Sequence, residues 1–508
     1  MDRLRGIERP IADDTEVARR ALVHPQDWVN PKPAHKYDLV VLGGGTAGLV
    51  SAMGAAGLGA RVALVERHLL GGDCLNTGCV PSKAMIRSAR AVGELRRAAA
   101  LGVTASPVDV DFAAVMRRMR ERRAAIAVND SAERLRRAGV DVFFGAARFA
   151  DATTVLVDEA RLRFGRAVIA TGGRPVAPPV PGLEASAYLT NESIFDLTKL
   201  PRRLLIIGAG PIGCELAQTL ARFGSTVTVL DQATDVLPRE DTDAATIVRQ
   251  SLVRDGVGFE LGVRLVRVTR ADGTVVIHLT REVGGRQTET SIAGDALLVA
   301  AGRAPNVEDL HLDAAGIECN KGGVVVNDRM QTSNRRVFAS GDVCSQFKFT
   351  HAADATSRLV VQNALFFGRR KASALVIPWV TYTDPEVAHV GVSSADVSRS
   401  ESQLETVTIQ LADVDRAIVD EETDGFIRVH HQRGRVRGCT IVASHAGEMI
   451  GEVVYAMGHG GTLADLSATV HPYPTQAEAL RKAGDAYRRQ SLTPAVRRWF
   501  ERYFRWTR

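Results

Sequence analysis

The chain lacks any run of eighteen uninterrupted apolar residues, and its opening MDRLRGIERPIADD has acidic residues where a signal peptide needs an apolar stretch. We therefore predict no membrane span and a cytoplasmic protein. The formal charge of +6 is not concentrated in one polybasic block, which argues against nucleic-acid binding. Six cysteines in 508 residues exclude a dense disulfide framework, and we expect no bound metal.

Two strand–glycine–helix units indicate an internally duplicated α/β fold. The first begins at Tyr37 with YDLVVLGGG, and the second begins with RRLLIIGAGPIGCELAQTLARFG. Beyond Ile377 alternating strands and helices predict an α+β domain. The predicted parts are an N-terminal extension (1–36, partly ordered at best), a first dinucleotide-binding part (37–185), a second one (186–305), a return to the first (306–375), an α+β domain (376–490) and a tail (491–508).

Residues 105 to 140 carry apolar and arginine-rich positions at helical spacing, as in DFAAVMRRMRERRAAIAV. This pattern predicts a long amphipathic helix that crosses the surface, with its charges on a solvated face.

The first glycine motif is Gly43, Gly45 and Gly48, directly after a strand and before a helix. Bare backbone there lets a pyrophosphate approach the helix N-terminus, and Glu66 ends the next strand, where a ribose-binding acid belongs. Together these features favour a dinucleotide site over a structural glycine turn.

The segment GGDCLNTGCVPSK carries Cys74 and Cys79 beside this dinucleotide fold. Such a pair can form a disulfide that exchanges electrons with a flavin, and a helix that starts beyond Cys79 would stabilise its thiolate. A zinc half-site would need a second ligand pair at the right spacing, and two inert thiols would leave the surrounding glycines unexplained. The pattern favours redox activity.

Over residues 37 to about 490 the chain resembles the class I pyridine nucleotide-disulfide oxidoreductases, the family of dihydrolipoamide dehydrogenase, glutathione reductase and mercuric reductase. GGDCLNTGCVPSK, ATGGRP, GAGPIGCE, GRAPN and ASGDV stand in that family's order. The resemblance implies a homodimer with the glutathione-reductase-like fold, two Rossmann-like domains and a C-terminal dimerisation domain. It also implies electron transfer from NAD(P)H through FAD to the cysteine pair and then to a small-molecule acceptor.

By this resemblance Cys79 is the flavin-proximal thiol and Cys74 the interchange thiol, while Lys83 and Glu215 form an ion pair near the flavin. Asp342 would bind the ribityl chain of FAD. The matching motifs supply further cofactor-binding positions: Gly72, Thr171, Gly172 and Gly302.

The second glycine motif, Gly208, Gly210 and Gly213, is expected to bind the nicotinamide nucleotide. The strand STVTVL leads to Asp231, which can bind a ribose 2′-hydroxyl and would repel a 2′-phosphate. Family enzymes that use NADPH usually have arginines in the next stretch, but DQATDVLPRED contains only Arg239, so NADH is preferred over NADPH. Pro211 stands where many relatives have a tyrosine over the nicotinamide.

The segment HPYPTQAEAL departs from the family pattern for thiol substrates, in which a histidine precedes a glutamate by five residues. Counting back five from Glu478 reaches Tyr473, as in mercuric reductase. Tyrosine is a poor base at neutral pH, with a reference pKa near 10. His471 is an alternative base, although it lies two residues upstream beside a proline.

The acceptor therefore stays open. A mercuric-reductase-like or other non-thiol acceptor leads, and a dihydrolipoamide-dehydrogenase-like disulfide is the alternative. No cysteine precedes Cys74 or follows Cys439, so the metal-binding module and the C-terminal cysteine pair of mercuric reductases are missing, which argues against efficient mercuric reduction. A hypothesis of another class is a flavin-containing sensor or binding protein.

The tail TPAVRRWFERYFRWTR predicts a basic, aromatic helix with Val496, Phe500 and Phe504 on one face. Packing on its own dimer is the favoured interpretation. Weak contact with a membrane surface is the alternative.

Overall fold

The structure is a computed structural model that describes residues 13–104, 106, 108–399 and 403–508. Two compact units make up the chain. The first comprises Met1–Ala209, Leu216–Gln232 and Gly256–Leu375, and the second comprises Gly210–Glu215, Ala233–Asp255 and Val376–Arg508. The last long segment of the second unit thus starts at the residue where the sequence predicts the α+β domain.

A seven-stranded sheet forms the centre of the first unit, in the order β3-β2-β1-β6-β5-β4, with β18 also paired to β6. Strands β3, β2, β1, β6 and β18 run parallel, whereas β5 and β4 are antiparallel. The strands are β1 (Tyr37–Leu42), β2 (Val62–Glu66), β3 (Val140–Phe144), β4 (Ala147–Asp151), β5 (Thr154–Val157), β6 (Ala160–Ile169) and β18 (Val337–Ala339).

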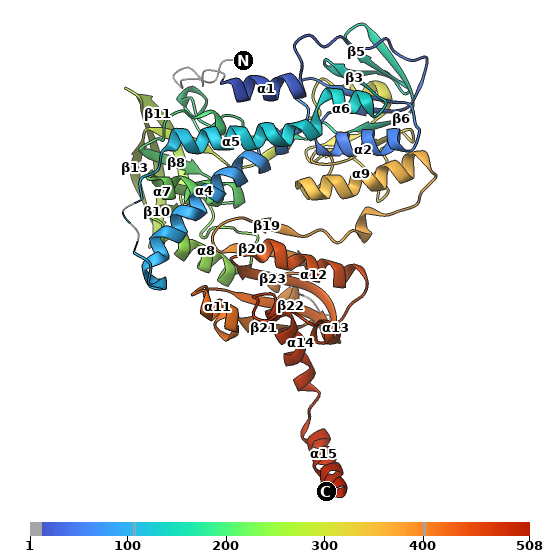
Figure 1. Ribbon diagram of the computed structural model, residues 1–508. Helices are drawn as coiled ribbons and strands as arrows, with labels where there is room; N and C mark the ends of the chain where they lie inside the picture. The colour runs from blue at the N-terminus through green and yellow to red at the C-terminus, as the bar shows by residue number, and fades with distance from the viewer. Residues whose placement is uncertain (1–12, 105, 107, 400–402) are drawn as a thin grey trace. The chain divides into compact units, whose positions relative to one another are not determined.

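Both faces of strand β1 are buried, as expected for the middle of a parallel sheet. Leu39 and Val41 join one apolar cluster, and Val40 and Leu42 join another on the opposite face. Helices α2 and α9 lie side by side in this unit (Figure 1). The helices that accompany the sheet are α1 (Asp14–Val23), α2 (Thr46–Gly57), α3 (Gly72–Asn76), α4 (Cys79–Arg97), α5 (Phe112–Ala127), α6 (Ala132–Arg137) and α9 (Thr350–Leu365).

The second glycine motif belongs to a four-stranded parallel sheet, β10-β9-β8-β14, followed by an antiparallel sheet, β11-β12-β13. Helix α7 (Pro211–Phe223) starts after β8, as the strand–glycine–helix pattern predicts. The strands are β8 (Arg203–Ile207), β9 (Thr226–Asp231), β10 (Val257–Leu261), β11 (Arg264–Ala271), β12 (Thr274–Val283), β13 (Arg286–Gly294) and β14 (Ala296–Val299).

The second unit is built on a five-stranded antiparallel sheet in the order β19-β20-β23-β22-β21. Its strands are β19 (Trp379–Thr381), β20 (Glu386–Gly391), β21 (Glu405–Gln410), β22 (Phe426–Gln432) and β23 (Arg435–Ala443). Its helices are α8 (Thr242–Arg254), α10 (Ser394–Arg399), α11 (Asp415–Val419), α12 (Ala446–Gly458), α13 (Leu463–Ala468), α14 (Glu478–Gln490) and α15 (Pro494–Thr507).

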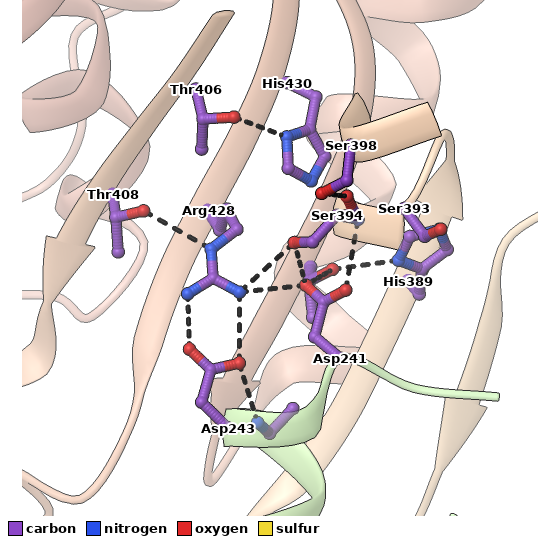
Figure 2. A network of polar contacts seen from close by, with 12 residues as sticks. Asp241, Asp243, His389, Ser393, Ser394, Ser398, Thr406, Thr408, Arg428 and His430 are labelled. Atoms are coloured by element: carbon purple, nitrogen blue, oxygen red, sulfur yellow. Dashed lines mark hydrogen bonds and ion pairs between the residues drawn. The ribbon is translucent and has the colours of Figure 1, made fainter. Parts of the chain in front are cut away.

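A polar network fastens the start of α8 to this sheet (Figure 2). The Arg428 guanidinium donates to Asp241 (2.9 Å) and to Asp243 (3.0 Å). Asp241 also accepts from the Ser394 hydroxyl at 2.8 Å and the Thr440 hydroxyl at 3.2 Å. These bonds outweigh burial and hold the pKa of Asp241 below its ordinary value. The carboxylate is therefore fully paired inside the unit.

The predicted N-terminal extension contains more order than the sequence indicates. Residues 1–12 lie outside the described part, but α1 forms directly afterwards and packs against α5 (Figure 1). The Arg19 side chain is 3% exposed and pairs with Glu16. Ion pairs from α5 also hold this segment, since Arg120 pairs with Asp13 at 2.5 Å and Arg123 with Glu16 at 2.9 Å. Because these partners are distant in sequence, the absence of an apolar period did not reveal the order of α1.

The predicted long helix over residues 105 to 140 is wrong in extent. Helix α5 covers Phe112–Ala127, a 3₁₀ turn (Val128–Asp130) follows, and α6 begins at Ala132 after the Ser131 cap. The prediction of a solvated charged face is also wrong in part, since Arg123 is buried and pairs with Glu16 at 2.9 Å.

The predicted fold class is confirmed: two Rossmann-like parts accompany an α+β domain. In the described residues no helix is both long and apolar enough to cross a membrane.

Candidate active site

The two cysteines of the redox motif lie in two consecutive helices of the first unit. Cys74 lies in the short helix α3, and Cys79 is the first residue of the 19-residue helix α4. Neither cysteine forms a disulfide in this structure. The Cys79 sulfur lies 3.4 Å from the Thr350 hydroxyl, at the start of α9. The expected helix thus starts at Cys79 itself, which places that sulfur where the helix dipole favours negative charge.

The environment of the two thiols is unequal. Cys79 is exposed and Cys74 is half-buried. A hydrogen bond with Cys79, followed by burial, raises the pKa of Cys74 above its ordinary value. An asymmetric pair of this kind suits thiol–disulfide exchange, in which one sulfur is attacked or leaves more readily than the other.

The first glycine motif forms a tight backbone cradle. Gly43 has φ of +107°, and a Cβ there would lie 2.3 Å from the Ala170 carbonyl oxygen. A Cβ on Gly48 would lie 1.8 Å from the Gly43 oxygen. Gly45 is the N-cap of α2 and has no side chain to occupy the helix N-terminus. This open N-terminus and bare backbone fit a dinucleotide pyrophosphate.

Glu66 closes the cradle at the end of β2. Its carboxylate accepts from the Gly44 amide at 2.6 Å and from the His68 amide at 2.7 Å. Gly72 approaches the same motif, since a Cβ on it would lie 2.7 Å from the Gly45 Cα. The acid and the glycines therefore converge at one sheet edge, as FAD binding requires.

The motifs ATGGRP and GRAPN meet where strands β7 (Gly173–Pro175) and β15 (Arg303–Pro305) pair. The Thr171 hydroxyl donates to the Asn306 carbonyl at 2.7 Å, and the Asn306 amide donates to the Gly172 carbonyl at 2.9 Å. Gly302 immediately precedes β15. These bonds link the two segments that connect the seven-stranded sheet with the four-stranded parallel sheet.

Asp342 lies beside this junction with Arg303, whose Nε is 3.5 Å from the Asp342 carboxylate. Burial raises the pKa of Asp342, and the charge of Arg303 opposes that effect. Arg303 also pairs with Asp73, next to the interchange cysteine in the sequence. A half-buried acid close to the cysteine segment fits the role in FAD binding that the resemblance implies for Asp342.

The second glycine motif repeats the arrangement of the first. Gly208 has φ of +115°, and a Cβ there would lie 2.6 Å from the Ala300 oxygen. Asp231 ends β9 and accepts from the Ala209 amide at 2.6 Å, just as Glu66 accepts from Gly44. Gly210 and Gly213 lie at the start of α7, in the stretch assigned to the second unit. Lys83 and Glu215 also belong to different units, and their ion pair stays a prediction.

The candidate acid–base residues lie in the second unit. The Tyr473 hydroxyl donates to Asp415 at 3.1 Å, and this bond raises the pKa of Tyr473 above its ordinary value. His471 pairs through Nε2 with Glu452 at 2.9 Å, and Glu478 pairs with Arg481. The three sequence-predicted residues thus have separate partners and do not form one hydrogen-bonded set.

The sequence analysis did not identify four residues near the cysteines: Asp73, Asn76, Arg303 and Thr350. Asp73 and Arg303 lie inside recognised motifs, so a charge beside the cysteine or after Gly302 was a usable signal. Thr350 had none, because it contacts Cys79 from 271 positions away, and the sequence did not indicate the arginines that reach Asn76 from distant segments. Arg123 donates to the Asn76 carbonyl at 2.8 Å across 47 positions.

Comparison with known proteins gives consistent relatives. The family described as "Pyridine nucleotide-disulphide oxidoreductase" matches residues 37–357, and its dimerisation domain matches residues 377–484. Mercuric reductase of Lysinibacillus sphaericus is 34% identical over 450 residues, which cover 88% of this chain and 82% of that protein. Dihydrolipoyl dehydrogenase 3 of Haloarcula marismortui is 31% identical over 468 residues, covering 90% and 97%.

Among solved structures, one similar chain is described as the Cu(II) complex of the HOCl-induced flavoprotein disulfide reductase RclA from Escherichia coli. It has a TM-score of 0.78 and 28% identity, and the match covers 89% of this chain and all of that one. These relatives share the architecture, but their names refer to different substrates.

Proposed function

Because the chain belongs to the pyridine nucleotide-disulphide oxidoreductase family, we propose that it passes electrons from NADH through FAD to the Cys74–Cys79 disulfide, and from there to a non-thiol acceptor. The family implies FAD and NAD(P)H, and the dimerisation domain supports a homodimer. The observation that carries the proposal is the asymmetric thiol pair at the N-terminus of α4 beside the glycine cradle.

Residues of the first unit would hold FAD: the Gly43, Gly45 and Gly48 backbone at the pyrophosphate, Glu66 at the ribose and Asp342 at the ribityl chain. When bound, FAD would accept a hydride from NADH and pass two electrons on to sulfur. The chain's own residues position the sulfurs, and the α4 N-terminus stabilises negative charge on Cys79 as the disulfide opens.

NADH is the proposed donor because Asp231 lies where a ribose hydroxyl would bind. Its carboxylate would repel a 2′-phosphate, and Arg239 is the one arginine in the stretch that follows. The measurement is kcat/KM for NADH and for NADPH. Preference for NADPH in the wild type would contradict this assignment.

A non-thiol acceptor is proposed because Tyr473 is a poor proton acceptor. Its pKa is raised by the bond to Asp415, and thiol substrates need a base that exchanges protons near neutral pH. Thiophilic metal ions are the first acceptors to test, since relatives are named mercuric reductase and one related structure is a Cu(II) complex. Reduction of a lipoamide-like disulfide is the second candidate, which the dihydrolipoyl dehydrogenase relative favours.

The test of the electron path is alkylation of cysteines in the air-oxidised, FAD-loaded protein before and after anaerobic NADH. We expect Cys74 and Cys79 to react only after NADH, and the exposed Cys319 to react in both samples. Cys79→Ser should abolish the NADH-dependent reaction of Cys74. Equal alkylation of the pair before and after NADH would favour the sensor hypothesis.

The test of the acceptor compares turnover with Hg(II), Cu(II), lipoamide and glutathione disulfide. Tyr473→His is expected to raise disulfide reduction by about a hundredfold and to leave NADH-dependent dye reduction unchanged. Tyr455→His is the matched control, because the two tyrosines are 71% and 69% exposed. Fast lipoamide turnover by the wild type would overturn the proposal in favour of the disulfide alternative.

A further inference from the structure

The last helix of the chain, α15, is well formed but has no cover within its own unit. The Thr493 side chain caps it by accepting from the Val496 amide at 3.3 Å, and Pro494 occupies the first turn. None of its residues is buried. A helix without a packed face is marginal in water, so these end signals indicate a structure that is completed by something else.

The two faces of α15 differ sharply in chemistry. At 100° per residue, the apolar and aromatic residues cover about half of the circumference. They are Ala495, Val496, Trp499, Phe500, Tyr503, Phe504 and Trp506. The other half carries the arginines at positions 497, 498, 502, 505 and 508 and a single acid, Glu501.

The aromatic face is preassembled. Trp499 stacks on Tyr503 with ring centroids 6.0 Å apart, and Phe500 stacks on Phe504 at 6.4 Å. Trp506, at the end of the face, is 83% exposed. A contiguous apolar surface of this kind in a water-soluble chain marks an interaction site.

The width of the aromatic face indicates a flat partner. A partner helix would need only a narrow seam of two positions in seven, whereas this face spans half of the helix. A planar surface contacts that whole half while the arginines remain beside it in water. Tryptophan, tyrosine and arginine also suit a boundary between apolar and polar layers, because each joins an apolar body to a polar end.

The positive charge of α15 indicates which kind of flat surface it would bind. Five arginines, counting the C-cap Arg508, accompany one glutamate, and the ion pair between Arg497 and Glu501 is loose at 3.7 Å. The excess positive charge complements anionic phospholipid head groups. With fourteen residues the helix is about 21 Å long, too short to cross an apolar core of about 30 Å, so it would lie parallel to the surface.

We propose that α15 is a peripheral anchor that docks the protein on membranes rich in anionic phospholipids. The aromatic face enters the interface, and the arginines contact the lipid phosphates. This surface lies outside the segments that match the family, and the proposal is independent of the acceptor.

The experiment is flotation of the FAD-loaded, full-length protein with large vesicles. One vesicle set contains phosphatidylcholine alone, and the other contains phosphatidylcholine with phosphatidylglycerol. We expect binding to the anionic set to be at least about tenfold stronger and to weaken in high salt. Equal binding to both sets, or binding to neither, would overturn the proposal.

Matched variants separate the two faces. Phe504→Ser is expected to weaken flotation by about tenfold. Phe366→Ser is the matched control, because the two phenylalanines are 54% (Phe366) and 52% (Phe504) exposed, and it should not weaken flotation since Phe366 lies outside α15. The double change Arg497→Ser with Arg505→Ser is expected to weaken flotation by about tenfold or more. The control is Arg335→Ser with Arg336→Ser, two exposed arginines in the first unit.

Two further readouts keep the result specific. NADH-dependent dye reduction should be unchanged in all four variants, since none of these residues is in the proposed cofactor or cysteine site. Sedimentation velocity without vesicles should show the same assembly for wild type and Phe504→Ser. A larger assembly in the wild type that Phe504→Ser dissolves would mean that a second copy covers the helix, which contradicts a membrane anchor.

Discussion

Helices α1 and α15 lie outside the segments that match the family and both contain arginines, but one arginine of α1 is buried whereas no residue of α15 is. Arg19 of α1 is buried, pairs with Glu16 and donates to the Asn76 side chain between the two cysteines. The arginines of α15 are exposed and share one loosely paired acid. A buried arginine specifies one packing arrangement, whereas an exposed row of arginines leaves the helix available to a partner.

The sharpest contrast is expected from removal of one acid in each helix. Glu16→Ala leaves Arg19 and Arg123 without their shared carboxylate, and breaking such a buried pair costs about 3–5 kcal/mol. Glu501→Ala removes an exposed partner and should change stability by less than about 0.5 kcal/mol. Amide hydrogen exchange within each helix measures the local opening free energy. Similar losses of opening free energy in both helices would contradict the contrast between the buried arginine of α1 and the exposed arginines of α15.

A pH titration should reveal the same contrast. Burial alone would raise the pKa of Glu16, but the hydrogen bond from Arg19 and the charge of Arg123 outweigh it and hold the pKa at about 2. Because the folded pKa lies below the ordinary glutamate value of 4.5, this stabilisation is present above pH 4.5 and is lost as the pH falls towards 2. The shift corresponds to about 3 kcal/mol.

Hydrogen exchange of the α1 amides between pH 5 and pH 2 tests this expectation, after correction for the intrinsic exchange rate. Glu16→Gln should remove the pH dependence of α1 opening. Unchanged protection of wild-type α1 down to pH 2 would show that the ion pairs do not hold the helix.

The helix caps should give a smaller difference. Asp13 accepts from the Glu16 amide at 2.9 Å, and Thr493 accepts from the Val496 amide at 3.3 Å. Loss of either cap bond costs its own helix about 1 kcal/mol, and Asp13→Ala also removes the ion pair with Arg120 at 2.5 Å. Asp13→Ala should lower the Tm of the first unit, since α1 is packed there, while Thr493→Ala should speed exchange in α15 without a shift in Tm. Calorimetry with hydrogen exchange separates the two effects.

The smallest effect is expected from loss of the tail. A chain that stops after Leu492 removes no buried residue of α15, so its Tm in solution should stay within about 1 °C of the wild type. Calorimetry is the measurement, and deletion of residues 14–23 is the contrasting variant with a large expected loss. A marked fall in Tm after the tail truncation would mean that α15 packs on its own dimer, as the sequence favoured.

Local patterns were sufficient for much of the candidate site. Strand–glycine–helix units predicted where Gly43 and Gly208 turn the chain, and the acids two dozen residues later, Glu66 and Asp231, do lie at strand ends. The redox motif predicted a helix beyond Cys79, and α4 begins at Cys79 itself. These features depend on neighbours in sequence, since a turn, a helix cap and a strand end are each decided within a few residues.

Other features required the tertiary structure. The Thr350 hydroxyl that contacts Cys79 is 271 positions away, and Tyr473 and its partner Asp415 are 58 positions apart. The ordered α1 was missed for the same reason, because its polar sequence shows no apolar period and its order comes from ion pairs with α5.

The sequence by itself determined the family, the two glycine cradles, the cysteine pair and the amphipathic pattern of the tail. Only the tertiary structure decided which arginines are buried, which acids pair with them and which groups face the sulfurs. The physical reason is that helix periods, turns and caps are local properties of the chain. Burial and charge pairing depend on which distant segments the fold brings together. The sequence therefore does not distinguish a buried, paired arginine from an exposed one.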